Sequence, residues 1–65
     1  MGEIRIIRDS GNVYQNGEIV SVADFIQSWT DCTDDQGTID FVWRIPIPSA
    51  VDFIADAWGI EYEFV

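Results

Sequence analysis

Lysine and histidine are both absent from this 65-residue chain, and cysteine occurs once, as Cys32. Without histidine there is no imidazole to serve as a base near neutral pH or as a metal ligand. A single cysteine cannot form an internal disulfide, which fits a reducing compartment. These absences exclude serine–histidine catalysis, zinc clusters and a disulfide scaffold.

The chain also has no long hydrophobic run, no basic N-terminal region and no glycine-rich phosphate loop. A bilayer span needs about 20 consecutive apolar residues. We therefore expect neither a signal peptide nor a membrane segment, and a cytoplasmic location. Little room remains for a substrate cleft in a domain of this size, so we predict that the protein is not an enzyme and binds no cofactor.

Twelve acidic residues stand against three arginines, Arg5, Arg8 and Arg44, which gives a net charge of −9. Phosphate groups are bound by lysine and arginine, so this balance opposes direct binding of nucleic acid. Self-repulsion of this size destabilises a small compact domain. The charge has two interpretations: an adaptation for solubility or high salt, or a surface shaped for a basic partner.

Hydrophobic residues make up 48% of the chain, enough for one domain over residues 1–65. Residues 3–9 are typical of a strand. In residues 13–20, Asn16-Gly17 between β-prone runs predicts a two-residue hairpin. We expect an N-terminal antiparallel meander of three short strands.

Two amphipathic helices are predicted, over residues 21–31 and 49–58, each opened by a capping serine. In the first, four apolar residues follow helical spacing: Val22, Phe25, Ile26 and Trp29. The second is expected to end at Gly59.

Residues 38–45 alternate as a strand does, which would place Ile39, Phe41, Trp43 and Ile45 on one inner face. Residues 45–48 then form an extended connector, and residues 60–65 a last strand. The expected fold is α+β, a mainly antiparallel sheet of four or five strands with two helices on one face. Trp29, Trp43 and Trp58 are all expected in the core; an exposed one would be a binding anchor.

Residues 30–40, TDCTDDQGTID, have three interpretations: a calcium loop, a redox thiol site or a solvated acidic edge. A calcium loop starting at Asp31 would need glycine where Gln36 stands and glutamate where Val42 stands. Cys32 follows a predicted helix among carboxylates, which disfavours a thiolate. We predict no metal site, with weak calcium binding as an alternative that a titration would test.

Acidic residues recur in pairs elsewhere. Asp52 and Asp56 lie four residues apart on a predicted helix, about 6 Å along its axis. Glu61 and Glu63 lie about 6.8 Å apart on one face of a predicted strand. Neither arrangement favours stability, because like charges at these spacings repel. With the acidic loop they define seven candidate partner-binding residues: Asp31, Asp34, Asp35, Asp52, Asp56, Glu61 and Glu63.

A very small, very acidic α+β domain without catalytic residues resembles the phage-encoded anti-CRISPR proteins, in particular inhibitors of type I systems that imitate DNA. The resemblance covers the whole chain in size and charge and rests on no motif. It implies a monomeric inhibitor, acting in the cytoplasm of an infected bacterium, whose acidic face occupies a basic DNA-binding surface of the effector.

Two other functions fit the same composition. An immunity protein or antitoxin that caps a basic nuclease-type toxin would share the electrostatics, and a neighbouring toxin gene would favour it. A small phage structural protein, acidic only for solubility, would carry its acids scattered over the whole surface.

Overall fold

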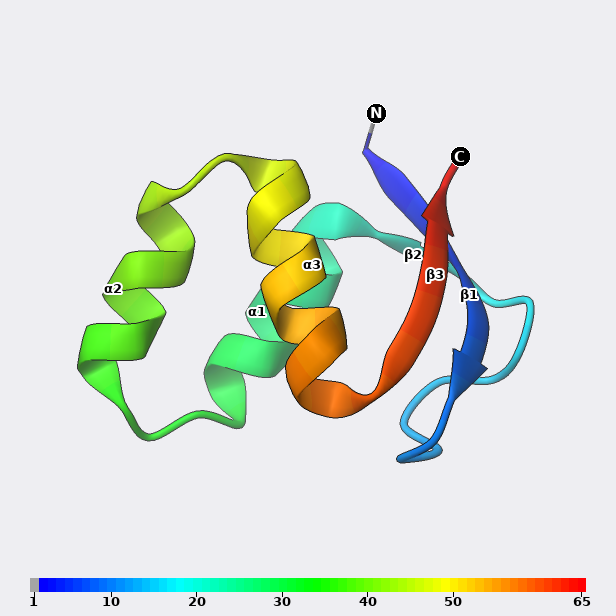
Figure 1. The fold of residues 1–65 in the computed structure, drawn as a ribbon, viewed down its shortest axis with the longest axis horizontal. Helices are drawn as coiled ribbons and strands as arrows, with labels where there is room; N and C mark the ends of the chain where they lie inside the picture. The colour runs from blue at the N-terminus through cyan, green and yellow to red at the C-terminus, as the bar shows by residue number, and fades with distance from the viewer. Residues whose placement is uncertain (1) are drawn as a thin grey trace.

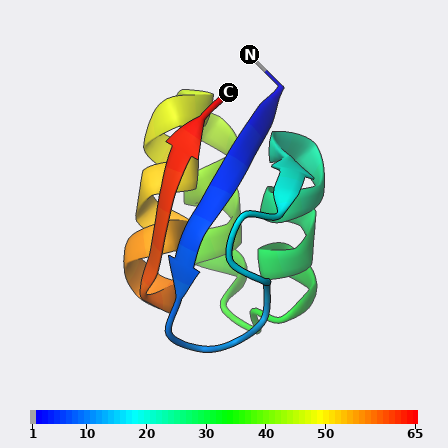
Figure 2. The ribbon, with the colours of Figure 1, turned by 90° about the vertical axis from the view of Figure 1, so that its right-hand side faces the viewer.

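The protein is described here by a computed structural model covering residues 2–65, which form three strands and three helices. The sheet is antiparallel in the order β2-β1-β3, and the helices lie on one side of it (Figures 1 and 2). The α+β class is confirmed. The predicted four or five strands and two helices were wrong, because the chain has these elements: β1 (Glu3–Asp9), β2 (Ile19–Ser21), α1 (Val22–Asp31), α2 (Gln36–Arg44), α3 (Ile47–Trp58) and β3 (Ile60–Phe64).

Strand β1 contains a register shift that changes which side chains face the helices. Ile4 and Ile6 are fully buried, but Ile7 and Arg8 both point outward and Asp9 is buried. The pairing with β3 shifts between Ile6 and Arg8, as a β-bulge does. The strand therefore exposes its second arginine and turns its last carboxylate inward.

The buried carboxylate of Asp9 organises the connection between β1 and β2. It accepts hydrogen bonds from the backbone N–H groups of Gly11, Val13 and Tyr14 at 2.8–2.9 Å. The chain bends around this side chain, so the predicted hairpin over residues 13–20 and the three-strand meander were wrong. Gly17 still occupies a turn with a φ of 87°, but only residues 19–21 beyond it form a strand.

Helix α1 confirms the first predicted helix. The Ser21 hydroxyl accepts a hydrogen bond from the backbone N–H of Asp24 at 3.0 Å, which caps the N-terminus. The predicted apolar stripe from Val22 to Trp29 is buried at all four positions. This stripe forms the centre of the helical side of the core.

Residues 36–44 form helix α2, so the strand predicted over residues 38–45 was wrong. The Asp35 side chain caps the helix by accepting from the backbone N–H groups of Gly37 and Thr38. Val42 is buried at 1% exposure, whereas Phe41 and Trp43 on either side are about half exposed. The alternation of residue types therefore does not correspond to an inner and an outer face.

Helix α3 begins at Ile47, two residues earlier than predicted, with Pro46 rather than Ser49 at its N-cap. Pro48 falls in the first helical turn, where its missing N–H costs no hydrogen bond. The helix ends as expected at Gly59, which has a φ of 69°. A Cβ there would collide with the Ser10 hydroxyl, so both the backbone and the space require glycine.

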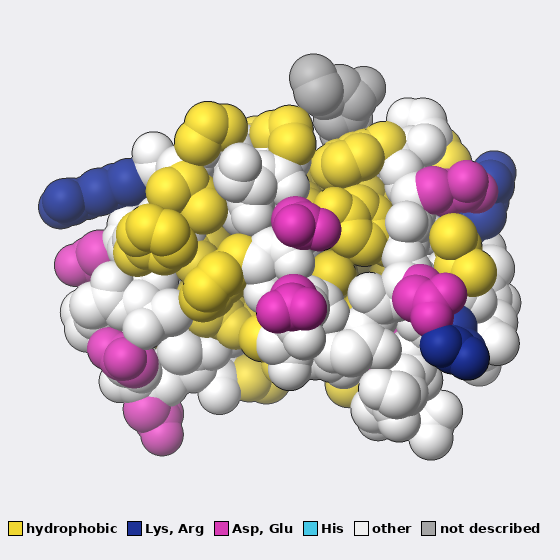
Figure 3. Space-filling view, viewed as in Figure 1, with side chains coloured by type: hydrophobic (Ala, Val, Ile, Leu, Met, Phe, Trp, Pro, Cys, Tyr) yellow, Lys and Arg dark blue, Asp and Glu magenta, His cyan; other side chains and the backbone are white. Residues whose placement is uncertain are grey.

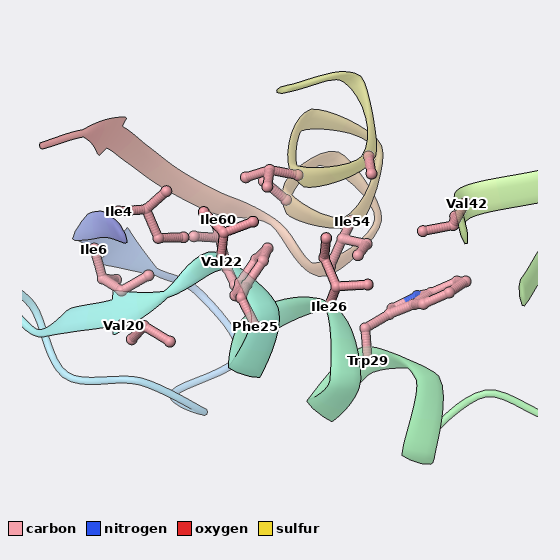
Figure 4. Close-up of a cluster of buried hydrophobic side chains, with 13 residues drawn as sticks. Ile4, Ile6, Val20, Val22, Phe25, Ile26, Trp29, Val42, Ile54 and Ile60 are labelled. Atoms are coloured by element: carbon pink, nitrogen blue, oxygen red, sulfur yellow. The ribbon is translucent and has the colours of Figure 1, made fainter. Parts of the chain in front are cut away.

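The core lies between the sheet and α1 and α3 (Figure 4). Phe25 is fully buried and packs edge-on against Trp58, with the ring centroids 5.9 Å apart. Trp29 is 5% exposed and extends from α1 toward Val42 of α2. Trp29 is thus a core residue and Trp58 is half-buried against the core, whereas Trp43 is exposed and its predicted core position was wrong.

Candidate functional site

The seven predicted partner-binding acids are all exposed, but they lie in three separate places. Asp31 ends α1, and Asp34 and Asp35 lie in the turn between α1 and α2. Asp52 and Asp56 lie on α3, and the two glutamates lie on β3. Helix α3 separates the turn from β3 (Figure 1), so these residues do not form one continuous row.

The two glutamates of β3 form ion pairs with arginines of the neighbouring strand. The register sets Arg5 opposite Glu63 and Arg8 opposite Glu61, and each pair is in salt-bridge contact. The bulge in β1 makes the second pair possible by turning Arg8 to the outer face. This part of the acidic surface is therefore largely neutralised.

In the turn between α1 and α2, Asp35 has a structural role as the cap of α2. The Thr38 hydroxyl donates to its Oδ2 at 2.8 Å, and two backbone N–H groups donate to its Oδ1. Hydrogen bonds from the Thr38 side chain, then from the Thr38 and Gly37 backbone, hold the pKa of Asp35 below its ordinary value. Asp35 is thus a charged group fixed in one orientation at the start of a helix.

The two aspartates of α3 line a groove of about 500 Å³ between α2, α3 and β3, which we call the α3 groove. Its walls include apolar side chains from all three elements. Asp52, Asp56 and Tyr62 supply polar atoms, and Phe41, Phe53 and Ile45 supply much of the apolar surface. The structure therefore brings two of the predicted residues together with aromatic side chains that the sequence had not indicated.

Tyr62 links β3 to α3 across the groove. Its hydroxyl lies 3.5 Å from Asp52 Oδ1, a long hydrogen bond. Burial raises the pKa of Tyr62, and the charge of Asp52 and this hydrogen bond raise it further. Asp52 is therefore exposed to solvent and also close enough to Tyr62 for its charge to affect the tyrosine hydroxyl.

The aromatic wall of the groove is a consequence of α2 being a helix. Phe41 and Phe53 pack edge to face with their centroids 5.8 Å apart, yet they are 51% and 39% exposed. Phe53 also packs edge-on against the buried ring of Trp29, with the ring centroids 6.3 Å apart. The signal that could have revealed this arrangement is the cap at Asp35, with Thr38 three residues later, which marks a helix start.

A second groove, of about 380 Å³, lies between α1, α2 and the start of α3, and is lined by apolar residues including Ile26, Trp43 and Ile47. The indole N–H of Trp43 donates to the Thr30 hydroxyl at 3.0 Å, which fixes the exposed ring. Cys32 is exposed. Within residues 2–65, no three potential metal-ligating side chains come together, and none of the helices there is long and apolar enough to cross a bilayer.

Figure 3 shows the face of the molecule on which α3 lies in front. Acidic side chains near the middle of the view are bordered by hydrophobic ones, whereas those over the sheet lie beside arginines. Comparison with protein-family models, curated proteins and solved structures found no match for this chain.

Proposed function

We propose that the protein is a non-enzymatic inhibitor that binds the basic DNA-binding surface of another protein. One observation carries this proposal: nine of its exposed carboxylates have no arginine nitrogen within 4.0 Å in residues 2–65. Stability does not require such a surface, because like charges on a small domain repel. A basic partner would be attracted to it and would associate faster.

The molecule is compact, with a radius of gyration of 11.0 Å and a longest extent of 31 Å. Duplex DNA carries one charge per roughly 1.7 Å of axis, or about 18 charges over that length. The net charge of −9 is about half as dense. The proposal therefore relies on the helical side of the molecule, where the acids have few cationic partners, more than on a uniform imitation of DNA.

The partner we propose is a type I CRISPR effector complex, in the cytoplasm of an infected bacterium. The support for this choice is the small size, the high negative charge and the exposed carboxylates described above. A monomer of the protein would occupy the surface that binds target DNA, and the DNA would be excluded by competition.

A competition experiment tests the proposal. A purified type I effector is incubated with labelled target duplex and increasing amounts of the protein, at salt concentrations from 50 to 200 mM. We expect displacement of the DNA, with an inhibition constant that weakens at least about tenfold over this range because the contacts are ionic. Absence of displacement, or displacement insensitive to salt, would refute the proposal.

Matched variants show which acids are responsible. The variant D31N/D34N/D52N/D56N removes four carboxylates from the helical side and leaves the cap at Asp35 intact. The variant E61Q/E63Q removes two that are already paired with arginine. We expect the first to weaken inhibition at least about tenfold and the second less than about threefold, since paired surface charges contribute little. Protection against a basic nuclease toxin, without effect on the CRISPR effector, would instead identify an immunity protein.

A further inference from the structure

The α3 groove combines exposed aromatic surface with unneutralised charge. Phe41 and Phe53 pack against each other, and Phe53 also packs against the buried ring of Trp29. Large apolar side chains in such a position are typical of interaction sites. The groove therefore offers a preformed apolar wall.

The carboxylates of Asp52 and Asp56 lie beside this wall and have no cationic partner within residues 2–65. They are one helical turn apart, on the same face of α3, and no arginine nitrogen lies within 4.0 Å of either in the described residues. Arg5 and Arg8 are engaged on the opposite side of the sheet from the helices. A partner molecule can therefore supply the cation that neutralises this pair.

The hydroxyl of Tyr62 lies beside the carboxylate of Asp52. It reaches one carboxylate oxygen at 3.5 Å, which leaves the second oxygen of Asp52 and both oxygens of Asp56 available. Burial, the charge of Asp52 and this hydrogen bond all raise the pKa of Tyr62. Several acceptor oxygens thus line a groove whose other residues, apart from Ser49, are apolar or aromatic.

Arginine fits this chemistry better than lysine or a metal ion. Its planar guanidinium is weakly hydrated, stacks on aromatic rings and donates in parallel to carboxylate oxygens. The ammonium of lysine is a compact, strongly hydrated charge that loses more on entering an apolar groove. In residues 2–65 no third ligand completes a metal site.

We propose that the α3 groove receives an arginine side chain of the partner protein, with the guanidinium at Asp52 and Asp56 and its plane and stem against Phe41, Phe53 and Tyr62. This inference rests on the proposed function for the existence of a basic partner. It adds a specific contact to a surface that would otherwise attract any cation. An apolar neighbour of the arginine would pack on the remaining aromatic surface.

Three capped tripeptides test the groove directly: acetyl-Leu-Arg-Leu-amide, its lysine analogue and its citrulline analogue, which keeps the shape without the charge. Each is titrated into isotope-labelled protein and followed by NMR. We expect the arginine peptide to shift resonances of Phe41, Asp52 and Tyr62, and to bind at least about fivefold more tightly than the lysine peptide. Equal binding of the arginine and lysine peptides, or shifts centred on the turn at residues 31–35, would overturn the proposal.

A matched pair of variants separates the groove from the general field of the protein. D52N/D56N and D31N/D34N change the net charge equally. The first variant should bind the arginine peptide about tenfold more weakly than the wild type, because a charge-assisted contact is lost. The second should weaken binding of this peptide less than about twofold. Equal effects would show that only net charge matters and would overturn the proposal.

Phe41→Leu tests the aromatic wall, because the side chain is half exposed and its replacement leaves the core unchanged. We expect the preference for arginine over lysine to fall to about twofold or less, since stacking is lost. An unchanged preference would overturn the assignment of the wall.

The effector competition distinguishes this inference from the function on which it rests. If the D52N/D56N variant displaces DNA as well as the wild type does, with the same salt dependence, the proposed function is supported and the arginine site in the α3 groove is refuted. Specific arginine binding by a protein that displaces no DNA would support the groove and refute the proposed function.

Discussion

The two halves of the molecule carry their charge differently. The sheet half, residues 2–21 and 59–65, has five acids and two arginines, a net charge of −3, and both arginines are paired with glutamates of β3. The helical half, residues 22–58, has seven acids and one arginine, a net charge of −6. The difference shows that net charge alone does not locate a binding surface, because strand register decides which acids remain unneutralised.

The helical half stabilises some of its acids without neutralising them. The amide of Gln27 donates to Asp31 at 2.9 Å, and that of Gln36 donates to Asp40 at 3.0 Å, each four residues along its helix. Lysine or arginine at these positions would form an ion pair instead. Glutamine preserves the negative charge of the helices while supplying a local hydrogen bond.

The largest expected effect tests whether the two halves unfold together. Phe25→Ala removes a fully buried ring that packs against Tyr14 of the β1–β2 connection and Trp58 of α3. We expect a loss of about 3–5 kcal/mol, comparable to the whole stability of a domain of this size. Phe41→Ala, at an exposed position, should cost less than about 1 kcal/mol.

Two probes, the amide NMR resonances of β1 and those of α2, follow both variants during urea unfolding. Coincident transitions by the two probes would show one cooperative unit. Separate transitions would mean that the helical half unfolds independently, and the comparison of the halves would then concern two folding units.

The second effect concerns an acid of the helical half that has a structural role. Asp35→Ala removes the cap of α2 and should lower the melting temperature by roughly 4–8 °C, as loss of a typical helix cap does in a small domain. Asp34→Ala, one residue earlier, should leave it within about 2 °C. Equal melting temperatures for the two variants would contradict the capping role.

The pH dependence of the same variants follows from the lowered pKa of Asp35. The pKa of Asp35 in the folded protein is lower than its pKa in the unfolded chain, which lies near 3.8. Its contribution to stability is therefore present above that pH and is lost as the pH falls through the folded pKa. We expect the difference in melting temperature between the wild type and Asp35→Ala to shrink below about pH 4.

A smaller effect compares the acids of the two halves. D52N/D56N removes a repulsive pair and should raise stability by a few tenths of a kcal/mol. E61Q/E63Q leaves Arg5 and Arg8 without their partners and should lower stability by up to about 1 kcal/mol. Melting temperatures at low salt should therefore rise for the first variant and fall for the second. Added salt should reduce both changes, because the charged groups are exposed. Changes of the same sign would break the comparison.

The smallest effect is the titration of Tyr62. Asp52→Asn removes the nearby charge, so the pKa of Tyr62 should fall toward its ordinary value of 10.0 while burial keeps it somewhat higher. Because the pKa of Tyr62 is higher in the folded protein than in the unfolded chain, the protein loses stability as the pH rises above about 10. The Asp52→Asn variant should lose less stability than the wild type over the same pH range. Absorbance of tyrosinate follows the titration, with Asp56→Asn as the control.

The sequence predicted those elements in which local signals agree. Helix α1 has both a capping serine and a stripe of helical period, and β3 follows a glycine that ends α3. In residues 38–45 the signals conflicted: β-branched and aromatic residues alternate as in a strand, while Asp35 and Thr38 form a helix cap. The cap was the correct indication of a helix, because its hydrogen bonds to the first backbone N–H groups contribute about 0.5–2 kcal/mol to helix stability.

The candidate site could be predicted only in part. The acids of α3 followed from helical spacing, but their aromatic neighbours depended on α2 and on how it packs against α3. The pairing of Glu61 and Glu63 with arginines depended on the register of β1 against β3, which the bulge at Ile7 shifts. Register of this kind is set by contacts between distant segments and is not encoded in either strand alone.

That bulge also determines how β1 tolerates changes in length. In a regular strand, removing one residue exchanges the inner and outer faces beyond the cut. Removing Ile7, the extra residue, would restore strict alternation while Ile4, Ile6 and Asp9 stay inside and Arg8 stays outside. Removing Arg5 instead would move Ile4 relative to Ile6 and disrupt the core. We therefore expect β1 to accept a one-residue deletion at Ile7, where the chain can shorten without turning over its two faces.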